Sequence, residues 1–307
     1  MKHKFRANGK LLIAGEYAVL DGALAFAVPT KVGQTLEVEY SVSIGNPKLN
    51  WEAYLMDGSL WFSAEFDLKT LEIIKTSNAK FSSKLWDIFQ VIEKLNSNFF
   101  HQQSQNIYCK TQLEFPKDWG LGSSSTLIYL LGKWANIDPF ELNKLTFKTS
   151  GYDVACAGID TPIFYQQSNG ERKIKEVKFR PDFINQLYFI YLNQKQDTQI
   201  SVSQNYTELP KDPEWIESIS QICYNMANSK TLYEFEKWMN LHEELIASKL
   251  KFPKVKELLF PDYTGSVKSL GAWGGDFILA TGREGFQDYF KSKGFTTILS
   301  FSDLLIR

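Results

Sequence analysis

Residues 119–126 read WGLGSSST, and this stretch decides the fold of the chain. Gly120 and Gly122 leave its backbone free of side-chain obstruction, and the three serines that follow can cap a helix or reach a phosphate or metal ion. Residues 126–135 are apolar at helical spacing, so the loop opens onto a helix N-terminus, where free N–H groups and the helix dipole favour an anion. The stretch predicts a phosphate-binding loop, although alone it also fits a plain capped turn. It is not a Walker A motif, because no lysine follows the glycines.

Composition indicates a globular protein with no general affinity for nucleic acids or membrane surfaces. Hydrophobic residues make up 44% of the 307 residues, and the formal net charge is -1 without a basic cluster. The three cysteines form no CxxC pair, which is typical of a reducing compartment. The first apolar run is about four residues long, shorter than the roughly seven of a signal peptide. We therefore expect a cytoplasmic protein without a transmembrane span.

Hydrophobic patterning predicts a sheet first and a mixture of helices and strands afterwards. Alternating segments over 4–40 and 51–66 predict strands, with turns at 21–22 and 57–58. Helical spacing follows over 78–98, a strand over 106–114, and helices over 126–135 and 138–145. The three histidines, His3, His101 and His242, are too far apart in sequence to suggest a metal site, so we expect each at the surface or in packing.

Beyond about residue 170 the organisation restarts. The pattern predicts a strand over 186–193, two helices over 213–249, strands over 267–270 and 277–280, a helix over 285–293 and a strand over 296–301. This order matches a ferredoxin-like half. The polar stretch 168–173 predicts a boundary between domains spanning 1–170 and 171–307.

Three further glycine-rich stretches accompany the central loop: NGKLLIAGEYAVLDG at 8–22, SGYDVA at 150–155 and VKSLGAWGGDFILATG at 267–282. In order and approximate spacing, the four stretches resemble the successive motifs of the GHMP kinases, a superfamily that includes galactokinase, homoserine kinase, mevalonate kinase and phosphomevalonate kinase. The resemblance covers nearly the whole chain. It implies a two-domain α+β fold, with an N-terminal ribosomal-protein-like α/β domain and a C-terminal ferredoxin-like domain.

The isoprenoid branch of the superfamily fits best. The opening motif is similar to that of phosphomevalonate kinases and, with His in place of Tyr17, to that of mevalonate kinases. The SGYDVA box also resembles a group of kinases named for the sequence GYDIA. The resemblance implies transfer of the ATP γ-phosphoryl group to mevalonate or phosphomevalonate, with ATP and Mg²⁺ as cofactors. The acceptor would be a small anionic molecule, and neither nucleic acid nor membrane is expected as a partner.

The resemblance also implies a role for individual residues. Asp153 matches the aspartate that accepts the proton from the attacking oxygen or orients it, and Lys10 matches the lysine expected to pair with it. Ser124 matches a magnesium ligand, and Glu141 is the nearest candidate for a second one, at a spacing one residue off. The substrate region would include Glu16, Tyr17 and Lys268. Phosphate-binding positions would be Gly120, Leu121, Gly122, Ser123, Ser124, Ser125, Gly271, Ala272, Gly274 and Gly275, with Asp276 flanking the last four.

Local alternatives remain open for these residues. Asp153 fits a turn or cap, Ser124 a helix cap, and Glu16 a solvated turn carboxylate. Trp119 and Trp273 depart from the family pattern, and Trp273 stands where a small residue is usual. Other functions also stay open: a kinase for a sugar or an amino-acid alcohol, the related decarboxylase, or a non-catalytic ATP-binding protein. The sequence carries no signal for the oligomeric state and is compatible with a homodimer.

Overall fold

The computed structural model describes residues 2–168, 170–194, 206, 209–273 and 275–306. The chain forms two compact units, each assembled from separate stretches. The first unit consists of Met1–Gly9, Val32–Lys117 and Gly122–Gly158, and the second of Lys10–Lys31, Asp118–Leu121 and Ile159–Arg307. The long strands β1 (Lys2–Ala14) and β2 (Ala25–Val42) therefore contribute residues to both units.

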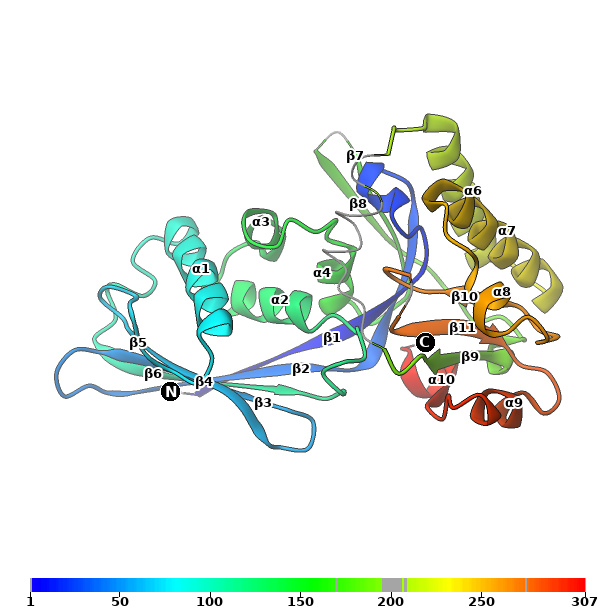
Figure 1. The fold of residues 1–307 in the computed structure, drawn as a ribbon. Coiled ribbons are helices and arrows are strands. Elements are labelled where there is room, and N and C mark those ends of the chain that lie inside the picture. The colour runs from blue at the N-terminus through cyan, green and yellow to red at the C-terminus, as the bar shows by residue number, and fades with distance from the viewer. Residues whose placement is uncertain (1, 169, 195–205, 207–208, 274, 307) are drawn as a thin grey trace. The chain divides into compact units, whose positions relative to one another are not determined.

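The first unit is a sheet with helices packed on it (Figure 1). In sheet order its strands are β5 (Ile73–Thr76), β4 (Leu60–Asp67), β3 (Lys48–Tyr54), β6 (Gln105–Leu113) and the part of β2 from Val32 onward. Strand β1, whose residues up to Gly9 belong to this unit, also pairs with β2. Its helices are α1 (Ala79–Leu95), α2 (Ser123–Ala135), α3 (Pro139–Leu145) and α4 (Tyr152–Ala157). The predicted strands at 51–54, 60–66 and 106–114 and the predicted helices are confirmed, whereas β5 and α4 had not been predicted.

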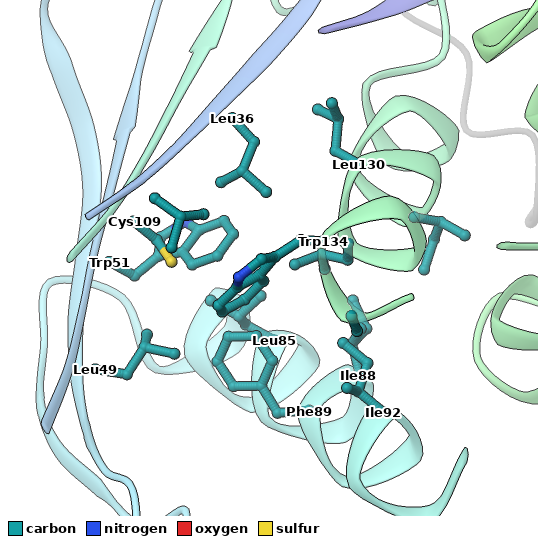
Figure 2. Close-up of a cluster of buried hydrophobic side chains, with 14 of the residues drawn as sticks. Leu36, Leu49, Trp51, Leu85, Ile88, Phe89, Ile92, Cys109, Leu130 and Trp134 are labelled. Atoms are coloured by element: carbon teal, nitrogen blue, oxygen red, sulfur yellow. The ribbon is translucent and has the colours of Figure 1, made fainter. Parts of the chain in front are cut away.

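Apolar side chains from the sheet and from two helices meet in the core of this unit. Figure 2 shows Leu49 and Trp51 of β3 facing Leu85 and Phe89 of α1, with Trp134 of α2 closing the cluster. All five side chains are buried. Complete burial of one such side chain stabilises the fold by about 1.5–3 kcal/mol. The cluster therefore anchors α2, the helix that begins at the serines of the central loop.

The second unit contains a four-stranded antiparallel sheet in the order β10-β11-β9-β12. The strands are β9 (Leu187–Tyr191), β10 (Val267–Ser269), β11 (Phe277–Thr281) and β12 (Ile298–Ser300). Along the chain, the long helices α6 (Pro213–Asn228) and α7 (Leu232–Leu250) follow β9 and precede β10, and α9 (Phe286–Ser292) precedes β12. In space, α6 and α7 pack side by side (Figure 1). The predicted order of a strand, helices, two strands, a helix and a strand is confirmed.

Several short elements complete the second unit. Two of them, α8 (Val255–Leu259) and α10 (Phe301–Leu304), are helices, and η1 (Ala18–Asp21) and η2 (Ile184–Gln186) are 3-10 turns. The Asp21-Gly22 turn lies between β1 and β2 as predicted, with Gly22 in the left-handed region at φ 95 after η1. The last predicted strand is shorter than expected, because α10 begins at Phe301.

Of the polar stretch, residues 168 and 170–173 lie where β7 (Ile163–Ser168) ends and β8 (Glu171–Glu176) begins, and these two strands pair inside the second unit. A glycine-containing polar stretch is as typical of a hairpin turn as of a linker. The compact units therefore do not divide at residue 170, because residues 10–31 and 118–121 belong with the C-terminal part. Among the described residues, no helix combines the length and apolar character needed to cross a membrane.

Candidate functional site

The central glycine loop leads into α2 without a side-chain cap. The N-cap residue is Gly122, at φ 91 and ψ 39, and a glycine has no side chain with which to cap. The Ser125 hydroxyl donates back to the Gly122 carbonyl at 2.9 Å, whereas the Ser124 side chain is exposed. Thr126 is buried and its hydroxyl donates to Gln34 Oε1 at 2.6 Å, which fixes the first turn to β2. The first turn of α2 therefore presents backbone N–H groups and an exposed serine hydroxyl, as an anion site requires.

Lys10 contacts residues 120 and 121 of the central glycine loop, which belong to the second unit. Its backbone N–H donates to the Leu121 carbonyl at 3.0 Å, and its Nζ donates to the Gly120 carbonyl at 2.9 Å. A Cβ atom added at Gly120 would lie 2.3 Å from Asp276 Oδ2, and the residue has φ +64. A side chain at this position would therefore strain the backbone and displace the Asp276 carboxylate.

Trp119 is a packing residue in this structure. Its ring meets Phe277 of β11 edge-on, with centroids 5.4 Å apart, and lies 6.4 Å from Tyr191 of β9. The Tyr191 hydroxyl donates to the Asp118 carbonyl at 3.1 Å. Residues 118–121 are thus fixed to the sheet of the second unit, and the departure at Trp119 from the family pattern has a structural explanation.

Asp153 lies in the first turn of α4, after Gly151 at φ 93. Asp153 Oδ1 accepts the Val154 N–H at 3.0 Å and lies 3.4 Å from the Thr149 hydroxyl. The same hydroxyl lies 3.0 Å from Oδ1 of Asn143, a buried residue of α3. The sequence analysis missed Thr149 and Asn143. The position of Thr149 four residues before the aspartate could have indicated the first of them.

Ser124 and Glu141 are the candidate magnesium ligands. Glu141 is exposed on α3 and lies 3.8 Å from Lys144 Nζ, a contact between solvated side chains. Within the described part of the chain, no three His, Cys, Asp or Glu side chains gather into a metal-binding group. Protein sites for Mg²⁺ use one or two carboxylates together with phosphates and waters. The roles of Ser124 and Glu141 as magnesium ligands both stay predictions.

Four ionisable side chains form a second cluster, which we call the buried charge cluster: Glu16, His242, Glu243 and Lys268. Each is at most 2% exposed. Lys268 Nζ lies 2.5 Å from Glu16 Oε1, and the other carboxylate oxygen lies 3.2 Å from His242 Nε2. Glu243 accepts the Ser269 N–H at 3.1 Å and the Ser269 hydroxyl at 3.0 Å. Glu16 and Lys268, expected in the substrate region, are thus enclosed by protein and paired with each other.

Burial sets the protonation of this cluster. It raises the pKa of Glu16, an effect that the positive charge of Lys268 opposes. Burial, with Lys268 as the second cause, lowers the pKa of His242 well below its usual value, so the imidazole is neutral at pH 7. His242 Nε2 accepts the Gly15 N–H at 2.9 Å, which agrees with an unprotonated nitrogen. Burial also raises the pKa of Glu243 to about 7.

Two members of this cluster had no role in the sequence analysis. His242 was expected at the surface or in packing, and it is buried, whereas Glu243 was not singled out. Phe235, Met239 and Ile246 mark the buried face of α7, and His242 falls on the same face by helical spacing. That spacing was the available signal, because a histidine on an apolar face needs a polar partner when it is buried.

Residues 270–276, which we call the C-terminal glycine loop, connect β10 and β11. The Tyr17 hydroxyl donates to the Ala272 carbonyl at 2.8 Å, so Tyr17 contacts this loop. Trp273 is 5% exposed, and its Nε1 has no hydrogen-bond partner among the described residues. Gly271 is half-buried and Gly275 is buried, whereas Gly274 lies outside the described residues. Trp273 is therefore enclosed by protein.

Comparison with solved structures identifies the fold. The chain is similar to Streptococcus pneumoniae phosphomevalonate kinase in complex with phosphomevalonate and AMPPNP, with 16% identity, a TM-score of 0.68, and 97% of this chain and 99% of that one covered. It is also similar to L. major mevalonate kinase in complex with R-mevalonate, with 15% identity and a TM-score of 0.64. That match covers 96% of this chain and 94% of the mevalonate kinase. Lactococcus lactis galactokinase complexed with galactose matches with 15% identity and a TM-score of 0.61. That match covers 95% of this chain and 89% of the galactokinase. No protein-family model and no curated protein sequence matches the chain.

These similarities extend over nearly the full length of each chain. The protein therefore has the two-domain α+β fold of the GHMP kinases, as the sequence predicted. At identities of 15–16% the likeness concerns the fold. Function has to be argued from the residues of the site, because one fold can host many activities.

Proposed function

We propose that this protein is an ATP-dependent kinase that transfers the γ-phosphoryl group of ATP to the alcohol or phosphate of a small anionic acceptor, mevalonate or phosphomevalonate. One observation carries the proposal. Helix α2 begins directly after Gly122, a residue that cannot cap it, and presents the N–H groups of its first turn beside the exposed Ser124 hydroxyl. Such a terminus suits the phosphates of a nucleotide. The fold of known kinases supports the same assignment.

Phosphoryl transfer depends mainly on positioning and on charge placed where the transition state develops it. The N–H groups of residues 120–125 would hold the phosphates. Asp153 would accept the proton of the attacking oxygen, while Val154 and Thr149 orient its carboxylate through the contacts at 3.0 and 3.4 Å. Lys10, fixed to the Gly120 carbonyl, would contribute positive charge. The expected pairing of Lys10 with Asp153 stays a prediction.

Mg²⁺, when bound, neutralises charge on the nucleotide phosphates. The Ser124 hydroxyl would serve as its protein ligand, because it is exposed on the first turn of α2. We keep Glu141 as a second candidate ligand, since its contact with Lys144 is long and solvated and is therefore weak. The glycine loop at 270–276 is proposed to contact the nucleotide through Gly271, Ala272, Gly274 and Gly275.

Turnover with a panel of acceptors tests the proposal. The purified protein is incubated with Mg²⁺-ATP and separately with mevalonate, phosphomevalonate, galactose and homoserine, and ADP release and the phosphorylated product are measured. We expect turnover with mevalonate or phosphomevalonate. Turnover only with galactose or homoserine would contradict the proposed acceptor but would still support a kinase activity. Loss of carbon dioxide from an acceptor would identify a decarboxylase instead, and absence of nucleotide binding would end the proposal.

A further inference from the structure

The buried charge cluster carries a large desolvation cost. Removing a carboxylate or an ammonium ion from water carries a large penalty, and a buried ion pair is often no better for stability than apolar side chains of the same volume. The pair Glu16 and Lys268 is fully enclosed in the second unit. The presence of these buried charges therefore needs an explanation other than stability. Their contacts with the C-terminal glycine loop and with Ser269 just before it suggest one.

Three members of the cluster, Glu16, Glu243 and Lys268, and the neighbouring Tyr17 contact the C-terminal glycine loop or the residue just before it, whereas His242 contacts Gly15 and Glu16. Glu243 of α7 accepts the N–H of Ser269, the last residue of β10. Lys268 Nζ donates to the Ser269 carbonyl at 2.7 Å while it pairs with Glu16. A hydrogen bond from the Gly271 N–H lowers the pKa of Glu16 against the effect of burial. Within the loop itself, Ala272 accepts the Tyr17 hydroxyl.

The backbone of the loop requires such support. Trp273 has φ 51 and Asp276 has φ 54, values in the left-handed region that side-chain-bearing residues rarely adopt. A loop with two such residues persists only when the surrounding structure fixes it. Tyr17, which supplies one of the contacts, is itself held at φ 61. The contacts from Glu16 and Tyr17 hold Gly271 and Ala272, and the contact from Glu243 of α7 holds Ser269 just before the loop.

We propose that Glu16, Tyr17, Glu243 and Lys268 are positioning residues that fix the C-terminal glycine loop in the conformation that binds the nucleotide. This inference rests on the proposed kinase function. It replaces the expected contacts of Glu16, Tyr17 and Lys268 with substrate by contacts with the loop. All three side chains are at most 5% exposed, which suits an internal support.

A pair of tyrosine variants tests the proposal. Tyr17→Phe removes the hydroxyl that holds Ala272, and Tyr263→Phe is the matched control. The Tyr263 hydroxyl donates to the Thr281 carbonyl at 2.6 Å, at the other end of the same β10–β11 hairpin, and both tyrosines are 5% exposed. Each variant loses one buried hydrogen bond to a backbone carbonyl, so similar losses of melting temperature are expected. Only Tyr17→Phe should loosen the C-terminal glycine loop.

Two measurements are made on the full chain: hydrogen–deuterium exchange of residues 270–277 and the Kd of AMPPNP. We expect faster exchange in Tyr17→Phe and a Kd about five- to tenfold higher, since one hydrogen bond is lost. Tyr263→Phe should leave both unchanged. Equal effects of the two variants, or no effect of Tyr17→Phe on either measurement, would overturn the proposal, as would faster exchange with an unchanged Kd.

Substitutions at Glu243 supply a second test. Glu243→Gln keeps an oxygen that can accept the Ser269 N–H, whereas Glu243→Leu leaves that donor buried and unpaired. We expect Glu243→Leu to raise the exchange rate and the Kd, and Glu243→Gln to restore both toward the wild-type values. If the wild-type chain binds no nucleotide, the kinase proposal fails. The exchange rates then still show whether these residues hold the loop, and unchanged rates in Glu243→Leu would contradict that.

Discussion

The carboxylate of Asp153 is oriented by neighbours that the motif SGYDVA does not include. Thr149 and Asn143 are linked through a hydroxyl that has a single proton to share between Asn143 Oδ1 at 3.0 Å and Asp153 Oδ1 at 3.4 Å. Because Asn143 is buried, its side chain holds Thr149 in place. Sequence reasoning found the aspartate through its motif. It could not find Asn143, because nothing local indicates that a helical asparagine turns inward.

Thr149→Val tests this orientation at nearly constant volume. The variant keeps the branched shape and removes the hydroxyl, so we expect kcat to fall about fivefold with an unchanged KM for ATP. Thr149→Ser, which keeps the hydroxyl, should retain most of the wild-type kcat. Steady-state kinetics decide the matter, and equal kcat values for Thr149→Val and the wild type would remove Thr149 from the account.

Gly120 offers a second test at a single residue. A Cβ there would lie 2.3–2.8 Å from the Asp276 carboxylate, and the residue has φ +64. Gly285 is the matched control, since it has φ +68 and an added Cβ would meet no atom within 4 Å. Both alanine substitutions should cost about 1 kcal/mol through the backbone. We expect only Gly120→Ala to raise the Kd of AMPPNP, by about tenfold or more, and similar nucleotide binding by the two variants would contradict this role of the loop.

At the scale of the elements, hydrophobic patterning predicted most helices and strands, including α1, α2 and the order of strands and helices from β9 to β12. It failed for the β7–β8 hairpin, where a polar strand and a glycine turn resemble a linker. All six residues of β8 are exposed, so the strand carries no alternation to detect. It also missed the polar residues on the buried face of α7. Their partners lie far away in the chain, as Glu16 and Lys268 illustrate at a separation of 252 residues.

Helix α7 gives the protein a pH dependence that can be measured. Burial raises the pKa of Glu243 from its ordinary 4.5 to about 7. The folded state therefore holds a proton that the unfolded state releases, and the stability contributed by this group falls as pH rises from about 4.5 to about 7. Glu16, whose pKa burial also raises, acts in the same direction.

Glu243→Gln removes the titrating group and keeps the side-chain shape. We expect the wild-type free energy of unfolding to fall by on the order of 3 kcal/mol between pH 5 and pH 7.5 through this residue, and the variant to show a smaller fall. Urea unfolding at several pH values measures the difference. Parallel pH profiles for the two proteins would show that Glu243 is not protonated in the folded state.

For the whole molecule, four glycine-rich motifs in the right order were enough to predict the fold, and the structures of GHMP kinases confirm it. We propose phosphate binding for these motifs, and they do not specify an acceptor. Kinases for mevalonate and galactose and a mevalonate diphosphate decarboxylase all share this fold. Any residues that select an acceptor between the motifs have no pattern to reveal them in a single sequence. The same holds for the proposed second magnesium ligand.

Phosphoryl transfer by an Asp153→Ala variant tests the central claim most directly, with AMPPNP binding measured in the same preparation. The account predicts that the variant binds the nucleotide with the wild-type Kd and transfers phosphate to the acceptor at least about a hundredfold more slowly than the wild type. Transfer at the wild-type rate by Asp153→Ala would contradict it.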